Sequence, residues 1–347
     1  MIDVVVVTYN AKQILARCLQ SIWKHTRDFP YSLTVLDNCS TDGTFEYLKS
    51  LQPRRARMIR APKNLGFSGA ANLILKHLKS EFVALLDDDI EVPARWLEAL
   101  YSQIRNKPNV GIVGSKIVYP NQRIMAAEVR MNPIRCPSAN ELDQGQREYV
   151  KECDMLIGPC WLMRRELISK VGDFDEQFFP SQGEDYDYCI RTRLAGYKII
   201  YNGQVKIVHH HLFRSGSVSQ NRANRLAFKK KWSESFAQFP LADSHPVDQW
   251  MSKAIQLVQR TEFKSALELC EQVERLGPQF SEPIVKALAL VGLGQAEEAS
   301  RIFGQLLELN PSNFLAHYYL MRISRTETKT DLINATLSYG SDLLRRE

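Results

Sequence analysis

The stretch that most constrains the fold is a run of five apolar residues, 82–86, followed directly by three aspartates. A short apolar run bounded by polar residues is typical of a buried strand in a parallel sheet. Acids at the carboxyl end of such a strand lie in the crevice where open α/β sheets bind ligands. Asp87, Asp88 and Asp89 repel one another, so a divalent cation would stabilise them, although an acidic turn in solvent explains the three acids taken alone equally well.

Earlier segments have the same design of apolar run, polar loop and amphipathic helix. Residues 4–7 are valines, and apolar side chains from Ile14 to Ile22 then recur at helical spacing. Residues 33–36 form a second run before turn and N-cap residues. The polar residues that end these two strands are Thr8, Tyr9, Asn10 and Asp37. Successive units of this kind predict a parallel sheet with right-handed crossovers and ligand contacts at the strand ends.

Residues 57–60 are a weak third strand, and the segment 64–72 that follows it is rich in glycine and small side chains. Asn64 and Gly66 begin this segment, and small residues at a helix start let the backbone approach a phosphate closely. The signal is weak, because the same residues also permit plain packing of a helix on a sheet. After the acidic strand, Pro93 predicts a helix that begins there and ends near Arg105.

The middle of the chain supplies further candidates. Residues 110–119 predict a strand, and the irregular stretch 120–150 predicts a long loop or a short antiparallel excursion that contacts the acceptor substrate. Residues 155–163 are regular again, and a helix is predicted to begin near Glu184 with Asp185 in its first turn. Helix capping explains one or two acids in a first turn, but it does not require the three acids found at positions 184, 185 and 187.

Strand-like residues 198–201 and 205–208 lead to three consecutive histidines, 209–211. A lone histidine is more often structural than a ligand, and we keep that interpretation for His210 and His211. His209 directly follows the apolar strand, so it is the candidate to complete a metal site with the aspartates. Carboxylates with one imidazole favour Mn²⁺ or Mg²⁺ over an ion that prefers thiolates.

Composition excludes several classes of protein. The 347 residues contain no stretch near the ~18 consecutive apolar residues of a membrane span. The amino terminus lacks a signal peptide, so we expect a soluble, cytoplasmic protein. Seven cysteines without a Cys-x-x-Cys pair indicate neither a disulfide framework nor a zinc ribbon.

The formal charge of +6 is unevenly distributed, with a basic cluster formed by Arg222, Arg225 and residues 229–231. A nucleic-acid recognition motif is missing, so we expect no nucleic-acid partner. An anionic membrane surface, such as the inner face of the cell membrane, and a diphosphate ligand explain the cluster equally well. A helix face that is simply solvated is favoured over both.

The ordered motifs resemble the family 2 glycosyltransferases of GT-A fold, particularly the rhamnosyltransferase-like members. The resemblance covers roughly residues 3–232, and each block is weak alone but specific in combination. The matching blocks are residues 6–10, 37–44, 64–67, 87–89, 172–176, 184–187 and His209. Cys39 and the run of three histidines depart from the family pattern.

This resemblance implies a role for each matching position. Thr8, Tyr9 and Asn10 would hold the nucleotide, and Asp37 would bind the base. The resemblance further implies that Asn64 and Gly66 line the nucleotide sugar. Asp89 and His209 would bind the metal, and Asp87 or Asp88 would lie near the ribose and sugar. Asp185 would be the general base. It also implies an α/β fold of GT-A type, with a mostly parallel open sheet flanked by helices.

The composition changes after Trp232, and residues 239–246 read as a linker. We therefore predict a catalytic domain of residues 1–240 and an all-α helical-repeat domain of residues 241–347. A pattern of small and apolar residues recurs 33 residues later, from Ala266 to Ala299 and from Pro278 to Pro311, close to the ~34-residue tetratricopeptide period. Such repeats present a concave surface. This surface is predicted to bind a partner or the acceptor, or else only to pack on the catalytic domain or form a dimer.

The sequence thus predicts a metal-dependent, inverting transferase that uses a nucleotide-diphosphate sugar as donor. The acceptor is a hydroxyl of a glycan, a lipid-linked glycan or a protein such as flagellin. A nucleotidyltransferase is an alternative, but residues 8–11 lack the glycine-rich, basic first turn that it would need. A second alternative is a non-catalytic adaptor in which a decayed transferase domain accompanies the repeats. The joint presence of the aspartates, Asp185 and His209 weighs against that decay.

Overall fold

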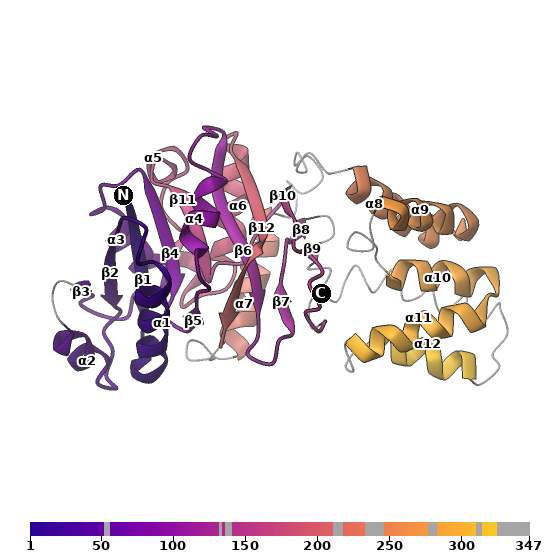
Figure 1. The fold of residues 1–347 in the computed structure, drawn as a ribbon, viewed down its shortest axis with the longest axis horizontal. Helices are drawn as coiled ribbons and strands as arrows, with labels where there is room; N and C mark the ends of the chain where they lie inside the picture. The colour runs from indigo at the N-terminus through magenta and orange to yellow at the C-terminus, as the bar shows by residue number, and fades with distance from the viewer. Residues whose placement is uncertain are drawn as a thin grey trace. The chain divides into compact units, whose positions relative to one another are not determined.

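The computed structural model describes residues 1–51, 56–131, 134–135, 141–210, 218–232, 246–276, 283–309 and 314–324. The chain divides into two compact units, which are described separately (Figure 1). One unit consists of residues 1–132 and 148–242, and the other of residues 133–147 and 243–347. The domain boundary predicted at residue 240 stays a prediction, because it lies among residues 233–245, outside the described part of the chain.

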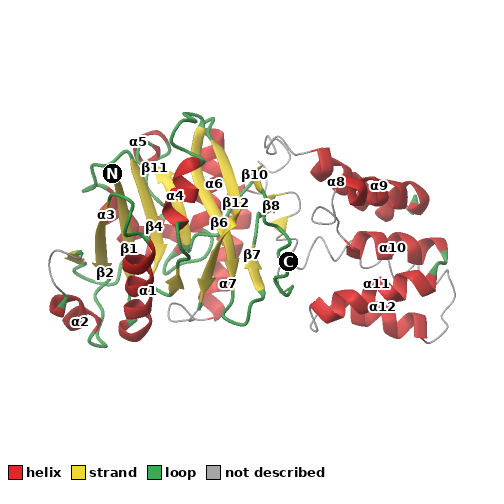
Figure 2. Cartoon of the chain, in the orientation of Figure 1, coloured by secondary structure: helices red, strands yellow, loops and turns green. Residues whose placement is uncertain are grey.

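The first unit is built on a mixed sheet with the strand order β10-β12-β6-β11-β4-β1-β2-β3 (Figure 2). These strands are β1 (Ile2–Thr8), β2 (Tyr31–Asp37), β3 (Arg57–Arg60), β4 (Phe82–Asp87), β6 (Val110–Val118), β10 (Val150–Cys153), β11 (Cys160–Arg164) and β12 (Lys198–His209). The strands β3, β2, β1 and β4 are parallel neighbours, as are β6 and β12. The mostly parallel sheet predicted from the sequence is therefore confirmed.

Short strands extend this sheet or lie beside it. The two-residue strand β5 (Ile90–Glu91) pairs with β12, and β7 (Ile124–Ala126) pairs with β6. The stretch 120–150, predicted as a long loop or a short antiparallel excursion, also contains β8 (Arg130–Met131) and β9 (Ile134–Arg135), which form a separate two-stranded sheet. Strand β11 runs antiparallel between β4 and β6, so it interrupts the parallel order.

Helices cover the faces of the sheet. Alternate side chains of β1, Val4 and Val6, share a buried core with residues of α1 (Lys12–His25) and α4 (Trp96–Ser102). Figure 1 shows these two helices in front of the sheet and α6 (Glu184–Leu194) behind it. The remaining helices of this unit are α2 (Thr44–Ser50), α3 (Gly66–Leu75), α5 (Leu167–Lys170), the short 3₁₀ helix η1 (Glu176–Phe178) and α7 (Val218–Trp232).

Two predicted boundaries need correction. The helix expected from Pro93 to Arg105 is only α4, and Arg95 directly before it has a left-handed φ of 57°. The two strands expected at 198–201 and 205–208 are one strand, β12, whose pairing with β6 shifts register between Asn202 and Lys206. A bulge of this kind interrupts the side-chain alternation on which the sequence interpretation depends.

The second unit contains strand β9, and its described residues from 246 onward are mostly helical. Its helices are α8 (Pro246–Gln259), α9 (Phe263–Leu276), α10 (Pro283–Leu293), α11 (Ala296–Leu309) and α12 (Phe314–Ser324). Helices α9 and α11 carry the recurring Ala266 and Ala299, which are both fully buried in one apolar core, whereas Pro278 and Pro311 lie outside the described residues. The predicted repeat thus falls on two helices, while its assignment to the tetratricopeptide class stays a prediction. In neither unit is a described helix both long and apolar enough to span a bilayer.

Arg164, at the end of β11, is a buried cation that holds the irregular turn after α4. Its guanidinium donates to the carbonyl oxygens of Ile104, Lys107 and Val110 at 2.9–3.0 Å. Each hydrogen bond from a charged group contributes ~1.5–3 kcal/mol. We expect Arg164→Met to lower the free energy of unfolding by about 3 kcal/mol, measured by urea denaturation.

The matched control is the neighbouring Arg165, which is exposed and donates through Nε to the carbonyl of Ser80 at 3.0 Å. Arg165→Met should cost less than about 1 kcal/mol, as surface substitutions usually do. Equal losses in the two variants would contradict the structural role given to Arg164.

Candidate active site

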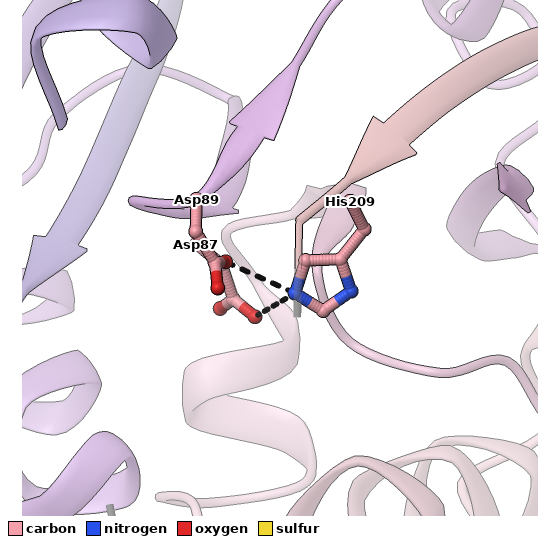
Figure 3. A group of neighbouring side chains, drawn as sticks. All are labelled: Asp87, Asp89 and His209. Atoms are coloured by element: carbon pink, nitrogen blue, oxygen red, sulfur yellow. Dashed lines mark ion pairs between the residues drawn. The ribbon is translucent and has the colours of Figure 1, made fainter. Parts of the chain in front are cut away.

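The three aspartates lie in the turn between β4 and β5, and pairing of β5 with β12 brings His209 beside them. In this antiparallel pairing His209 is opposite Ile90. The backbone N–H of His210 donates to the carbonyl of Asp89 at 2.9 Å, which fixes the two segments together. His209 Nε2 then lies 3.0 Å from Asp89 Oδ1 and 3.9 Å from Asp87 Oδ2 (Figure 3).

Asp87, Asp89 and His209 each offer a ligand atom, and these atoms lie within 4.8 Å of one another. Two carboxylates and one imidazole form a donor set that suits Mn²⁺ or Mg²⁺. His210 faces a different partner, since its Nε2 lies 2.8 Å from Glu91 Oε1. The geometry therefore fits a divalent cation held by His209 and not by His210.

Crowding at this turn changes the pKa values of its groups. Burial raises the pKa of Asp87 to about 7, even though its side chain is still 31% exposed; the charge of His209 opposes the rise, and the other acids add to it. Burial alone would lower the pKa of His209, but its hydrogen bond to Asp89 and the surrounding carboxylates raise it overall. The site thus holds an excess of negative charge that a proton or a metal ion can offset.

Asp88 differs from its neighbours, because its carboxylate is directed toward the loop that follows β1. Thr8 Oγ1 donates to Asp88 Oδ2 at 2.7 Å, and the backbone N–H of Tyr9 donates to the same oxygen at 3.2 Å. Asp88 is only 5% exposed. These bonds join the ends of β1 and β4, and the predicted contacts of Asp88, Thr8 and Tyr9 with a nucleotide sugar stay predictions.

Asn10 and Asp37 fix the loops at the ends of β1 and β2. The backbone N–H of Asn10 donates to Ser40 Oγ at 2.9 Å, and its side-chain oxygen accepts from the Thr41 N–H at 2.8 Å. Asp37 is fully buried and accepts from the Ser40 N–H at 3.2 Å. Its Oδ2 also lies 3.5 Å from Arg60 Nε. The predicted contact of Asp37 with a base is not tested by these bonds.

The small residues at the start of α3 serve packing within the chain. Gly66 has a φ of 68°, and a Cβ added there would lie 2.8 Å from the ring of Phe179 and 2.9 Å from the Pro180 carbonyl. Asn64 Oδ1 accepts from the Gly66 N–H at 2.9 Å. The close approach that we predicted for a ligand is thus made here by residues 179–180, and a contact of Asn64 or Gly66 with the sugar stays a prediction.

Asp185 lies in the first turn of α6, near the acidic turn. The Gly158 N–H donates to its Oδ2 at 3.2 Å, and the Tyr186 N–H donates to its Oδ1 at 2.8 Å. Burial raises the pKa of Asp185 to about 6, while these backbone bonds lower it. The Asp87 N–H donates to the carbonyl of Pro159, the residue after Gly158, at 3.0 Å, so residues 158–159 link Asp185 to the end of β4.

The contacts that hold α6 in place were not predicted from the sequence. Asp187 is fully buried and accepts from Trp232 Nε1 at 3.0 Å and from Arg191 Nε at 2.8 Å. Lys231 Nζ lies 2.6 Å from Asp187 Oδ1. The sequence feature that pointed to a further role was Asp187, the third acid of the 184–187 cluster, because helix capping alone does not require a third acid. Its partners on α7 are some forty-five residues away, so spacing could not reveal them.

Comparison with known proteins identifies the family of the segment that contains the acidic turn. Residues 3–172, about half of the chain, match the family model described as Glycosyl transferase family 2. An N-acetylglucosaminyl-diphospho-decaprenol L-rhamnosyltransferase of Mycobacterium tuberculosis is 28% identical over 271 residues, which cover 71% of this chain and 85% of that protein. The uncharacterized protein y4gI of Sinorhizobium fredii is 26% identical over 222 residues, which cover 60% of this chain but only 24% of that protein.

Among solved structures, a crystal structure of GalNAc-T7 with UDP, GalNAc and Mn²⁺ superposes with a TM-score of 0.56. It shares 15% sequence identity and covers 68% of this chain and 50% of that one, so it shows a likeness of fold. Residues 3–172 are thus a family 2 glycosyltransferase domain, and the predictions of the fold class and of a glycosyltransferase are confirmed at this level.

The bond between Thr8 and Asp88 can be tested without any ligand. We expect the variants Thr8→Val and Asp88→Asn to be non-additive in the free energy of unfolding, with a coupling of ~1 kcal/mol or more, because each removes the same buried contact. Urea denaturation of the two single variants and the double variant measures this coupling.

The control cycle pairs Thr8→Val with Ser32→Ala. Ser32 bonds Asp3 at the opposite end of β1, so these two losses should add within about 0.5 kcal/mol. Additive losses for Thr8 and Asp88 would contradict the contact between them.

Proposed function

We propose that this glycosyltransferase moves a sugar from a nucleotide-diphosphate donor to an acceptor hydroxyl with inversion at the anomeric carbon. The observation that carries the proposal is that Asp87, Asp89, His209 and Asp185 gather at the end of strand β4, and β4 lies in the family 2 domain of residues 3–172. The first three form a site for a divalent cation, and the fourth is a carboxylate with a raised pKa close to that site.

The acidic turn and His209 would bind the cation that accompanies the diphosphate. When bound, a divalent cation supplies Lewis-acid neutralisation of the charge that develops on a leaving diphosphate. Asp89 and His209 are the primary ligands in this proposal, and Asp87 completes the cluster. Asn10, Asp37, Asn64 and Gly66 belong to the ordered loops at the strand ends, where the nucleotide and its sugar would lie.

Asp185 would accept the proton of the acceptor hydroxyl as that oxygen attacks the anomeric carbon. A base is most effective when its pKa lies near the working pH, and burial raises the pKa of Asp185 to about 6. The backbone N–H groups of Gly158 and Tyr186 hold the carboxylate in a fixed orientation. Among the residues that the structure describes, this proposal assigns one carboxylate as a base and none as a covalent nucleophile, which corresponds to direct displacement and therefore to inversion.

We favour a lipid-linked glycan as acceptor, over a free glycan or a protein such as flagellin. The support is the similarity to a relative whose name specifies a diphospho-decaprenol substrate, across most of that relative's length. In this proposal the helical unit of residues 243–347 recruits a partner or the acceptor.

Metal binding tests the first half of the proposal. We expect His209→Ala to weaken Mn²⁺ binding by at least ~10-fold, because even the loss of a residue that only supports a metal ligand costs 10-fold or more. Electron paramagnetic resonance of free Mn²⁺ during a titration measures the affinity directly.

His210→Ala is the matched control, since that imidazole pairs with Glu91 and should leave Mn²⁺ affinity unchanged. Equal weakening in both variants, or none in His209→Ala, would exclude His209 as a ligand. Retained transfer after complete chelation would remove the metal from the reaction.

The pH dependence of transfer tests Asp185. Only the deprotonated carboxylate can accept a proton, so kcat/KM should be constant above the pKa of about 6 and fall about tenfold per pH unit below it. Asp185→Asn should lower kcat by ~10²-fold or more and leave nucleotide binding nearly intact. Initial rates at saturating metal give the profile, and calorimetry gives the nucleotide affinity.

Asp28→Asn removes an exposed acid on a surface loop and should keep the wild-type rate and profile. Full activity in Asp185→Asn would rule out Asp185 as the base.

A further inference from the structure

Helix α7 has an unusual charge composition. Its fifteen residues, 218–232, include five basic side chains and no acidic one. These basic residues are Arg222, Arg225, Lys229, Lys230 and Lys231. The sequence alone favoured a solvated face for this cluster, but the structure shows how its charges are distributed around the helix.

One side of α7 is used for packing. Asn224 Nδ2 donates to the carbonyl oxygens of Phe178, Phe179 and Ser181 at 2.7–3.1 Å. One and two turns further on, Phe228 and Trp232 are buried. Lys231 lies on the same side, where its Nζ is 2.6 Å from Asp175 and from Asp187. The inner face therefore contains the large aromatic residues of the helix and neutralises one of its five cations.

The opposite side of α7 is exposed and carries positive charge. Arg225, Lys229 and Lys230 are exposed, and Leu226 between them is 58% exposed. At about 100° per residue, Leu226 and Lys230 lie nearly half a turn away from Asn224 and Phe228, and the exposed Arg225 and Lys229 lie on the arc between the inner face and Leu226. The outer face, defined here as Arg225, Leu226, Lys229 and Lys230, thus joins three cations to one apolar side chain.

We propose that this outer face docks on an anionic membrane surface. Lysine and arginine near a bilayer with anionic lipids are attracted by its negative surface potential. An exposed leucine surrounded by cations can enter the interfacial region, whereas it gains nothing from a phosphate backbone. The aromatic residues Phe228 and Trp232 face inward, so the outer face offers no platform on which nucleic-acid bases could stack.

Docking of this kind would set the position of the transfer site. The inner face of α7 bonds the backbone of residues 178–181, and the Phe67 N–H donates to the Pro180 carbonyl at 2.7 Å. The helix that touches the bilayer is therefore joined to the loop that covers Gly66. A lipid-linked acceptor would be presented to this side of the domain, but membrane docking itself does not depend on the proposed transfer reaction.

Vesicle flotation of the full-length chain tests the proposal without any nucleotide sugar or acceptor. We expect the protein to bind vesicles that contain phosphatidylglycerol, not vesicles of phosphatidylcholine alone, and to be released by high salt. The triple variant Arg225→Gln, Lys229→Gln, Lys230→Gln should bind on the order of a hundredfold more weakly, at about fivefold per cation. Leu226→Ser should weaken binding several-fold while the salt dependence remains.

The matched control replaces three exposed cations of the helical unit, Lys253, Arg260 and Lys264, by glutamine. It makes the same change in net charge and should bind vesicles like the wild type. Equal weakening of vesicle binding in both triple variants would show that net charge alone, and not this face, drives binding. That result would overturn the proposal. Absence of wild-type binding to anionic vesicles at low salt, with or without binding to nucleic acid, would overturn it too.

Discussion

The candidate site depends on one short pairing, between the two residues of β5 and the last residues of β12. Strand β4 ends in the acidic turn, and without β5 that turn would have no fixed relation to His209, more than a hundred residues later. The antiparallel register places His209 opposite Ile90, and the bond from the His210 N–H to the Asp89 carbonyl closes the pairing. The backbone pairing of β5 with β12 therefore brings His209 Nε2 to 3.0 Å from Asp89 Oδ1.

This arrangement concentrates negative charge that the protein only partly offsets. Asp88 is stabilised by Thr8 and the Tyr9 N–H, and Asp89 by His209. Burial raises the pKa values of Asp87 and Asp185, and neighbouring carboxylates add to the rise at Asp87. The same excess of charge makes the site attractive to a divalent cation, and occupancy by such an ion would favour the ionised form of Asp87. Binding of metal and release of protons are thus coupled here.

Much of the fold could be predicted because its signals are local. The valines of β1, the run 82–86 and the amphipathic α1 follow from periodicity, and the strand ends then locate Thr8, Asp37 and the aspartates. The antiparallel β11 between β4 and β6 and the two-residue β5 could not be predicted, because pairing partners distant in sequence decide them. For the same reason the sequence could not show that Asp88 is directed toward Thr8 while Asp87 and Asp89 lie near His209. Gly66 correctly predicted that another group approaches the backbone closely, but the sequence did not show that this group is the segment 179–180.

Helix α7 shows how one element can serve two surfaces at once. Its inner face holds the base-bearing helix through Asp187 and the loop at 178–181 through Asn224. Because Phe228 and Trp232 are buried on the inner face, the outer face has no large aromatic residue. The helix carries five cations and no acid, and like charges close together on one helix repel one another. Lys231 pairs with two acids, and Arg225, Lys229 and Lys230 are exposed beside Leu226. Docking on an anionic surface, as proposed, would bring negative charge to these exposed side chains and accommodate the leucine.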